Sequence, residues 1–198
     1  MNVLVILAHP TPNSFNHAIA ETVVSTLEQL GHAGFFHDLY AEGFDPVLPS
    51  DEILTDDVDP VIAGHCEQVV TADGIVLIHP NWWGMPPAIL KGWVDRVIRP
   101  EVAYRFEEDD SGEGVPVGLL KAKTAIVLNT SNTPGSREHD VFGDPLENLW
   151  KTCIFDLCGI KDFHRRNFTV VVTSTEEERK GWLEKVESLI GQAFPGDQ

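Results

Sequence analysis

The chain is poor in positive charge. Lys and Arg total 14 against 31 Asp and Glu in 198 residues, which gives a formal net charge of -17. A surface of this sign repels nucleic-acid phosphates and anionic lipid headgroups, so neither nucleic acid nor a membrane surface is expected as a partner. The acidity needs no ligand to explain it, because a large net charge favours solubility.

Cysteine is scarce, and long apolar runs are absent. Cys66, Cys153 and Cys158 form no Cys-x-x-Cys pair, which indicates a reducing compartment and no metal cluster. Cys153 and Cys158 lie in one segment of apolar periodicity and are expected to be buried thiols. His9 and His79 have no partners at metal-ligand spacing. No apolar run approaches the ~20 residues of a membrane-spanning helix, and no basic leader opens the chain, so we expect a cytoplasmic protein without a targeting segment or a metal.

The usual glycine-rich phosphate loops and the nucleophile elbow are also missing. Instead, an apolar run over residues 3–8 breaks at His9 into a loop that contains Thr11, Ser14 and Asn16 and leads into a helical pattern. A strand, a short loop and a helix N-terminus collect free N–H groups and the positive helix end at one point, which suits a phosphate. The alternative is that Ser14 is only the N-cap of the helix.

Apolar runs and helix-period segments alternate along the whole chain. This order predicts one α/β domain over residues 1–198, a doubly wound five-stranded parallel sheet in the order 2-1-3-4-5 with helices on both faces. A capping box at Ser174 or Thr175 marks the start of the last helix. Strands are expected over residues 3–8, 34–38, 74–79, 124–130 and 163–172, helices over 15–30, 62–70, 90–97, 146–157 and 182–193, and an acidic loop over 40–59.

Two further loops follow the third and fourth predicted strands. The first contains Trp82 and Trp83 before Gly84, and two large aromatic rings in a turn are expected to cover something flat or apolar. The alternative is that they fill a corner of the core. The second loop, residues 129–144, opens with hydroxyl and amide groups that could contact the polar edge of a heterocycle, unless they form an ordinary turn cluster.

The loops after strands one, three and four meet at one edge of such a sheet. Together they offer a phosphate end, an aromatic wall and a hydrogen-bonding edge. A flavin nucleotide fits all three requirements.

Two motifs resemble the NAD(P)H:quinone oxidoreductase family of flavodoxin-like flavoproteins, which includes DT-diaphorase and the modulator-of-drug-activity proteins. One is Ala8-His9-Pro10 with Ser14-Phe15-Asn16-x-Ala18, and the other runs from Asn81 to Trp93, with Ala103-Tyr104 following. The resemblance implies that a flavin is held at its phosphate, ribityl or adenylate parts by His9, Ser14, Phe15, Asn16 and Ala18, is flanked at its ring by Pro80, Asn81, Trp82, Trp83 and Gly84, and is bonded at its polar edge by Thr130, Ser131, Asn132 and Thr133. Tyr104 would line the substrate side across a homodimer interface.

The resemblance also implies the chemistry. We expect a flavin-dependent NAD(P)H oxidoreductase that reduces quinones or similar flat acceptors by ping-pong hydride transfer through flavin N5. The match at Ser14-Phe15-Asn16 favours FAD over FMN as the cofactor. The alternatives are an ancillary regulatory flavoprotein of a potassium-efflux transporter and a flavodoxin-type electron carrier.

The chain departs from the family's mammalian members in the third loop. Asn129-Thr-Ser-Asn132 replaces a Thr-Thr-Gly-Gly run, and alignment on Gly143-Asp144 puts Phe142 at the position of the family's His. Fixed backbone and side-chain dipoles are therefore expected to stabilise the reduced flavin. Arg137, Glu138 and His139 are close enough to substitute for the family's residues, and His139 is the alternative proton donor. Tyr104 and His139 are the candidate catalytic residues.

Overall fold

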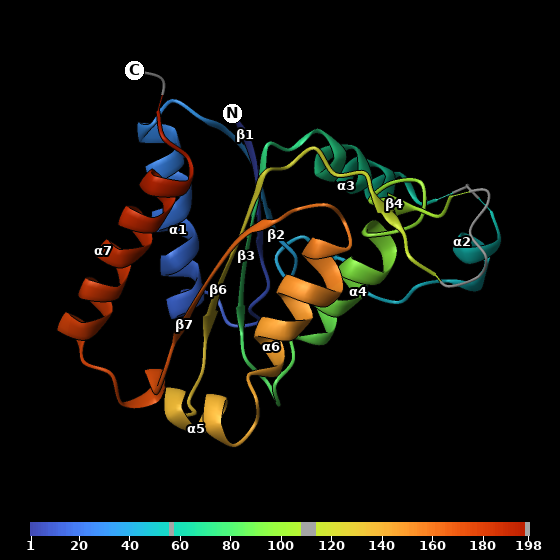
Figure 1. The fold of residues 1–198 in the computed structure, drawn as a ribbon. Coiled ribbons are helices and arrows are strands. Elements are labelled where there is room, and N and C mark those ends of the chain that lie inside the picture. The colour runs from blue at the N-terminus through green and yellow to red at the C-terminus, as the bar shows by residue number, and fades with distance from the viewer. Residues whose placement is uncertain (56–57, 108–113, 197–198) are drawn as a thin grey trace.

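The computed structural model describes residues 1–55, 58–107 and 114–196, and its centre is one parallel sheet in the order β2-β1-β3-β6-β7 (Figure 1). This is the predicted order 2-1-3-4-5, because the additional strands β4 (Tyr104–Arg105) and β5 (Val117–Gly118) form a separate antiparallel pair. The sheet strands are β1 (Asn2–Leu7), β2 (Ala33–Asp38), β3 (Gly74–Pro80), β6 (Thr124–Thr130) and β7 (Asp162–Phe168).

Helices cover both faces of the sheet, as the sequence predicted. α1 (Phe15–Gln29) and α7 (Glu176–Ala193) lie on one face, whereas α3 (Pro60–Thr71), α4 (Ala88–Val97), α6 (Pro145–Glu147) and the π-helix η1 (Asn148–Asp156) lie on the other (Figure 1). The register sets Val5 beside Val76 and Val76 beside Ile126, and all three pack in the layer of α1 and α7. The next row of the sheet faces the opposite layer, because side chains alternate along a strand. Strands β3 and β6 are therefore buried along their whole length.

The acidic loop predicted over residues 40–59 contains a short helix, α2 (Ser50–Leu54). Arg96 on α4 anchors it, because its Nε donates to Glu52 Oε2 over 3.1 Å and a second guanidinium nitrogen bonds the other carboxylate oxygen. Both side chains are buried. An ion pair between residues this far apart in sequence leaves no local pattern, which is why the helix was not predicted. Residues 56 and 57 of the predicted loop lie outside the described residues.

The expected burial of Cys153 is wrong. A helix over residues 146–157 was predicted with ordinary periodicity, but most of it is η1, in which hydrogen bonds run from i to i+5. Trp150 and Phe155, five residues apart, consequently share the buried side, and Cys153 is exposed. Cys158 is buried as expected, and burial raises the pKa of its thiol to about 12.

The segment after β6 and the end of the sheet also differ in detail from the prediction. Residues of the expected third loop form α5 (Gly135–Asp140), and β7 ends at Phe168, after which Val170 has φ 56° and a short 3-10 helix, η2 (Val171–Thr173), follows. The last helix begins at the predicted capping box, where Thr175 and Glu178 bond each other reciprocally. Over the described part of the chain, no helix combines the length and the apolar character needed to cross a membrane.

Candidate functional site

The loops that follow β1, β3 and β6 line one pocket of about 400 Å³ at the carboxyl edge of the sheet. We call it the carboxyl-edge pocket. Ten of the residues that the sequence singled out line it together with Val171 and Val172 of η2, which the sequence gave no reason to include. The ten are His9, Phe15, Asn16, Pro80, Asn81, Trp82, Thr130, Ser131, Asn132 and Thr133.

Asn16 joins the first loop to the third. Its side chain is 2% exposed, and its Nδ2 donates to Thr130 Oγ1 over 2.9 Å. Its Oδ1 is buried and has no hydrogen-bond partner among the residues that the structure describes. An unsatisfied buried acceptor costs about 1–3 kcal/mol, so this atom is suited to a ligand that brings a hydroxyl or N–H donor into the pocket.

The N-terminus of α1 carries no carboxylate in its first turn, so its positive end is not neutralised there. Ser14 is the N-cap of the helix: its Oγ accepts from His17 N and lies 2.8 Å from His17 Nδ1. It does not line the pocket. The structure therefore gives Ser14 the capping role that the sequence left as an alternative. Burial lowers the pKa of His9, and the hydrogen bond between its ring and the Thr11 backbone opposes that shift.

The aromatic loop is held by its own backbone and by Asn81. Asn81 N donates to Thr130 O over 2.6 Å, and Asn81 Oδ1 accepts from Gly84 N over 2.9 Å. Trp82 and Met85 exchange two backbone hydrogen bonds of 3.0 Å across a tight turn. The loop is thus fixed in shape before any ligand binds.

The two tryptophans are not core residues. Trp82 is 43% exposed and Trp83 is 100% exposed, which rules out the alternative that both fill a corner of the core. Trp83 also has φ 59°, a left-handed conformation that costs a bulky residue of the order of 1–3 kcal/mol. A strained turn that presents a whole indole to solvent suits contact with a flat ligand or a second chain.

His79 precedes the pocket residue Pro80 in β3 and supports the pocket from the protein core. It is fully buried, its Nε2 accepts from Trp150 Nε1 over 3.0 Å, and its Nδ1 lies 2.8 Å from Pro80 O. Burial lowers its pKa to about 4. His79 is therefore a neutral core residue whose two nitrogens fix the end of β3 against η1.

Sequence analysis missed the structural role of Glu138. This residue of α5 is 3% exposed, and its Oε1 accepts from Asn81 Nδ2 over 2.8 Å. A carboxylate among polar loop residues is normally solvated, and its neighbours Arg137 and His139 are exposed. Nothing in the local sequence therefore distinguishes Glu138 as a buried partner of the aromatic loop.

The remaining predicted site residues lie outside the carboxyl-edge pocket of a single chain: Ser14, Ala18, Trp83, Gly84, Tyr104 and His139. Tyr104 is on β4, towards the opposite end of α4, where its ring contacts Phe106 edge-on at 5.8 Å (Figure 1). His139 is exposed on α5, with Nδ1 3.7 Å from Asp140 Oδ1. Tyr104 was expected from a second chain, so the catalytic roles of both residues stay predictions.

One group of possible metal ligands occurs among the described residues, at His37, Glu42 and His65. His65 Nδ1 accepts from Trp93 Nε1, which leaves the proton on the other nitrogen of this neutral ring. His37 contacts Glu42 through Nδ1 and Gln68 through Nε2. His65 Nδ1 and both nitrogens of His37 are therefore engaged in protein contacts, and burial lowers the pKa of His65 to about 4.

Comparisons of this chain with known proteins all match it to proteins of one fold family. The family model described as a flavodoxin-like fold matches residues 1–190. A Haemophilus influenzae protein named as an uncharacterized NAD(P)H oxidoreductase is 34% identical over 191 residues, which cover 93% of this chain and 91% of that protein. The mouse ribosyldihydronicotinamide dehydrogenase [quinone] is 28% identical over 94% of this chain and 91% of its own.

Solved structures agree with this result. Smu.1420 from Streptococcus mutans is 31% identical with a TM-score of 0.84, over 97% of this chain and all of that one. The NAD(P)H:quinone oxidoreductase from Methanothermobacter marburgensis has the same fold, with a TM-score of 0.84 at 24% identity over 96% of this chain and 97% of that one.

Proposed function

Because the chain belongs to the flavodoxin-like fold family over residues 1–190, we propose that it is a flavin-dependent NAD(P)H oxidoreductase that reduces quinones or similar flat acceptors. The observation that carries this proposal is the carboxyl-edge pocket, where three loops far apart in sequence bring together a helix N-terminus, an aromatic wall and a buried acceptor without a partner. Such an edge is where open α/β sheets bind their ligands.

The residues of the pocket fit a flavin nucleotide. His9, Phe15, Asn16 and the first turn of α1 would hold the ribityl and phosphate end, with a ribityl hydroxyl as the donor that Asn16 Oδ1 lacks. Trp82 would flank the ring system. A flavin bound here supplies two-electron transfer between NAD(P)H and the acceptor.

The third loop would act through fixed dipoles. Within the described structure, the backbone N–H groups of Asn132 and Thr133 donate to no protein acceptor, and both residues line the pocket. Asn132 Oδ1 accepts from Val172 N over 3.0 Å, and Ser131 N donates to Phe168 O over 2.9 Å, so the loop is tied to the end of β7 and to the segment after it. Donors held in this way would stabilise negative charge on a bound ring without any change of protonation state.

We further propose FAD as the cofactor, NAD(P)H as the hydride donor, ping-pong exchange of donor and acceptor in one pocket, and a two-fold homodimer to which Tyr104 contributes across the seam. The exposed Trp83 supports the dimer, since its indole has no cover within one chain. FMN is the alternative cofactor: an azoreductase of Bacillus anthracis that shares the fold, with a TM-score of 0.73 at 15% identity over 96% of this chain and 98% of that one, is described in complex with FMN.

The test begins with the purified protein. We expect a flavin absorption spectrum, a released cofactor with the mass of FAD, and rapid oxidation of NADH or NADPH that depends on an added quinone such as 1,4-naphthoquinone. A flavin-loaded protein that oxidises neither nucleotide would contradict the proposal and favour an electron carrier. Co-purification with a membrane transporter would favour the regulatory alternative.

A further inference from the structure

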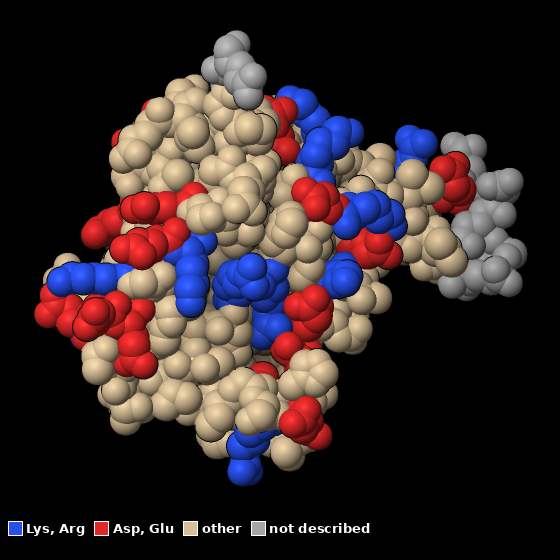
Figure 2. Space-filling model, turned by 60° about the vertical axis from the view of Figure 1, so that its left-hand side comes forward, with Lys and Arg blue, Asp and Glu red and all other residues tan. Residues whose placement is uncertain are grey.

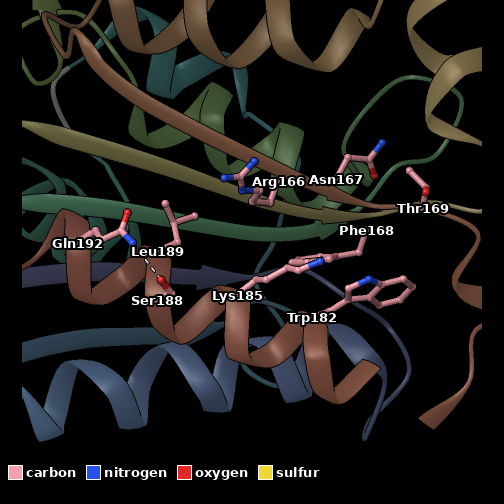
Figure 3. Close-up of a pocket in the computed structure, with 9 residues that line it drawn as sticks. All are labelled: Arg166, Asn167, Phe168, Thr169, Trp182, Lys185, Ser188, Leu189 and Gln192. Carbon is pink, nitrogen blue, oxygen red and sulfur yellow. Dashed lines mark hydrogen bonds between the residues drawn. The ribbon is translucent and has the colours of Figure 1, made fainter. Parts of the chain in front are cut away.

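A second pocket, of about 480 Å³, lies between β7 and α7 (Figure 3). We call it the α7 pocket. It shares no lining residue with the carboxyl-edge pocket. Between the two, Phe15 packs against Trp182 and Phe168, with ring centroids 5.6 and 6.1 Å apart. The proposed flavin site therefore does not account for this second hollow.

Two cations line the α7 pocket from opposite walls, Arg166 from β7 and Lys185 from α7 (Figure 3). Figure 2, which brings this side of the molecule forward, shows Lys and Arg side chains across the middle of the face, with Asp and Glu side chains around them. Among the described residues, neither side chain has a hydrogen-bond, ion-pair or ring partner, although the chain carries 31 acidic residues.

Neighbouring cations on the same two elements have partners, whereas these two do not. Arg165 on β7 bonds Asp144 Oδ2 over 2.7 Å, and Lys180 on α7 bonds Glu176 Oε1 over 2.8 Å. The carboxylates nearest to Lys185 along α7, Glu184 and Glu187, do not line the pocket. Two unneutralised cations that face one hollow attract an anion to it.

The rest of the lining is aromatic and polar. The Trp182 and Phe168 rings lie 5.7 Å apart at an interplanar angle of 37°, and Leu189 adds apolar surface beside them. Gln192 Nε2 donates to Ser188 Oγ over 3.0 Å, which leaves the Ser188 hydroxyl hydrogen available to a ligand. The pocket thus combines an apolar face with positively charged donors.

From these contacts we infer a second binding site, for a small aromatic anion that carries a phosphate or a carboxylate. Its flat body packs on the partly exposed Trp182 ring, which Phe168 supports from the core, and its anionic group lies between Arg166 and Lys185. This site goes beyond the proposed function and does not depend on it, since no residue of the carboxyl-edge pocket takes part.

Isothermal titration of the protein as purified, with its bound cofactor, tests the inference with four probes. The anions are 1-naphthyl phosphate and 1-naphthoate, the neutral analogue is 1-naphthalenemethanol, and inorganic phosphate lacks the ring. We expect at least one naphthyl anion to bind about tenfold more tightly than the neutral analogue and than inorganic phosphate. The order of the two anions identifies the preferred anionic group.

Variants assign the binding to this pocket. Arg166→Gln and Lys185→Gln should each weaken it about tenfold, and the double variant should abolish it, whereas Lys151→Gln, a matched exposed cation on η1, should not change it. Binding in the carboxyl-edge pocket would survive the double variant, and NAD(P)H oxidation should be the same in all four variants. Naphthyl anions that fail to bind, bind no better than the alcohol, or bind the double variant as tightly as the parent would overturn the inference.

Discussion

Asn81 and Glu138, 57 positions apart in the sequence, are joined by a hydrogen bond of 2.8 Å from Asn81 Nδ2 to Glu138 Oε1. The other atom of the same amide, Oδ1, accepts from Gly84 N. One side chain thus connects α5 to the turn that carries Trp82 and Trp83. The shape of the aromatic wall therefore depends on a carboxylate in the third loop, whose contact with Asn81 the sequence did not predict.

Replacing Glu138 should loosen the aromatic wall. Glu138→Ala leaves Asn81 Nδ2 without its acceptor, and we expect a loss of about 1–3 kcal/mol in the free energy of unfolding together with weaker flavin binding. Glu138→Gln keeps a carbonyl oxygen at that point and should retain most of both. Urea unfolding and flavin fluorescence titration measure the two effects. Equal flavin affinity in the parent and in Glu138→Ala would show that the bond does not position the wall.

A negative charge at Asn16 should weaken flavin binding. Asn16→Asp places a negative charge beside the proposed ribityl and phosphate end, and its repulsion of the neighbouring phosphate costs about 1–4 kcal/mol between the dielectric of water and an effective value near 20. Asn13→Asp is the matched control, because Asn13 is exposed in the same loop and does not line the pocket. If Asn16→Asp holds flavin as tightly as Asn13→Asp does, the phosphate lies elsewhere.

The exposed indole of Trp83 should be covered in a dimer. We expect light scattering at micromolar concentration to give twice the chain mass of 21.9 kDa. Trp83→Glu should shift the mass towards that of the monomer and lower quinone reduction, because a charge would be buried at the seam. Phe36→Glu changes an exposed aromatic residue on the edge strand β2 and should leave the mass unchanged. A fully active monomer would contradict the dimer.

The stability of the fold should fall in mild acid. Burial lowers the pKa of His79 to about 4, below the ordinary value near 6.5. The unfolded chain then binds the proton more readily, so the stabilisation is complete above pH ~6.5 and declines as the pH falls towards about 4. The contribution of this histidine is of the order of 2–4 kcal/mol.

Urea unfolding from pH 4.5 to 7.5 measures this dependence. His79→Gln keeps an acceptor for Trp150 and removes the titrating ring, so its free energy of unfolding should vary less steeply with pH. His65→Gln should flatten the curve in the same way, because burial lowers the pKa of His65 to about 4 as well. Curves for both variants that run parallel to the parent would refute the assignment.

Fixed dipoles, and not His139, should serve the reductive step. Stopped-flow reduction by NAD(P)H from about pH 5.5 to 8.5, the range in which histidine ordinarily titrates, should give parallel profiles in the parent and in His139→Asn. The exposure of His139 and the unpaired N–H groups of Asn132 and Thr133 support this expectation. A titration step that is present in the parent and missing in His139→Asn would make the imidazole the proton donor.

The sequence by itself determined the sheet and the edge at which its loops meet. The strands were predicted from continuous apolar runs at residues 74–79 and 124–130, and the start of the last helix from the capping box at Thr175. These patterns involve residues only a few positions apart, because strands and helix ends are formed by local interactions. The topology then determined where the loops meet, since parallel strands with helical crossovers bring their carboxyl ends to one side of the sheet. Ten of the predicted pocket residues consequently lie together.

Only the tertiary structure decided which side chains are buried, paired or left free. Asn81 bonds Glu138, which is 57 positions away, and Arg96 pairs with Glu52, which is 44 positions away. No local sequence pattern predicts contacts between residues so far apart. The widened turn of η1 exposes Cys153, and it is determined by tertiary packing and not by the spacing of apolar residues in the sequence. The unpaired cations of the α7 pocket have the same origin. Whether a charged side chain has a partner depends on which residues the fold brings close to it.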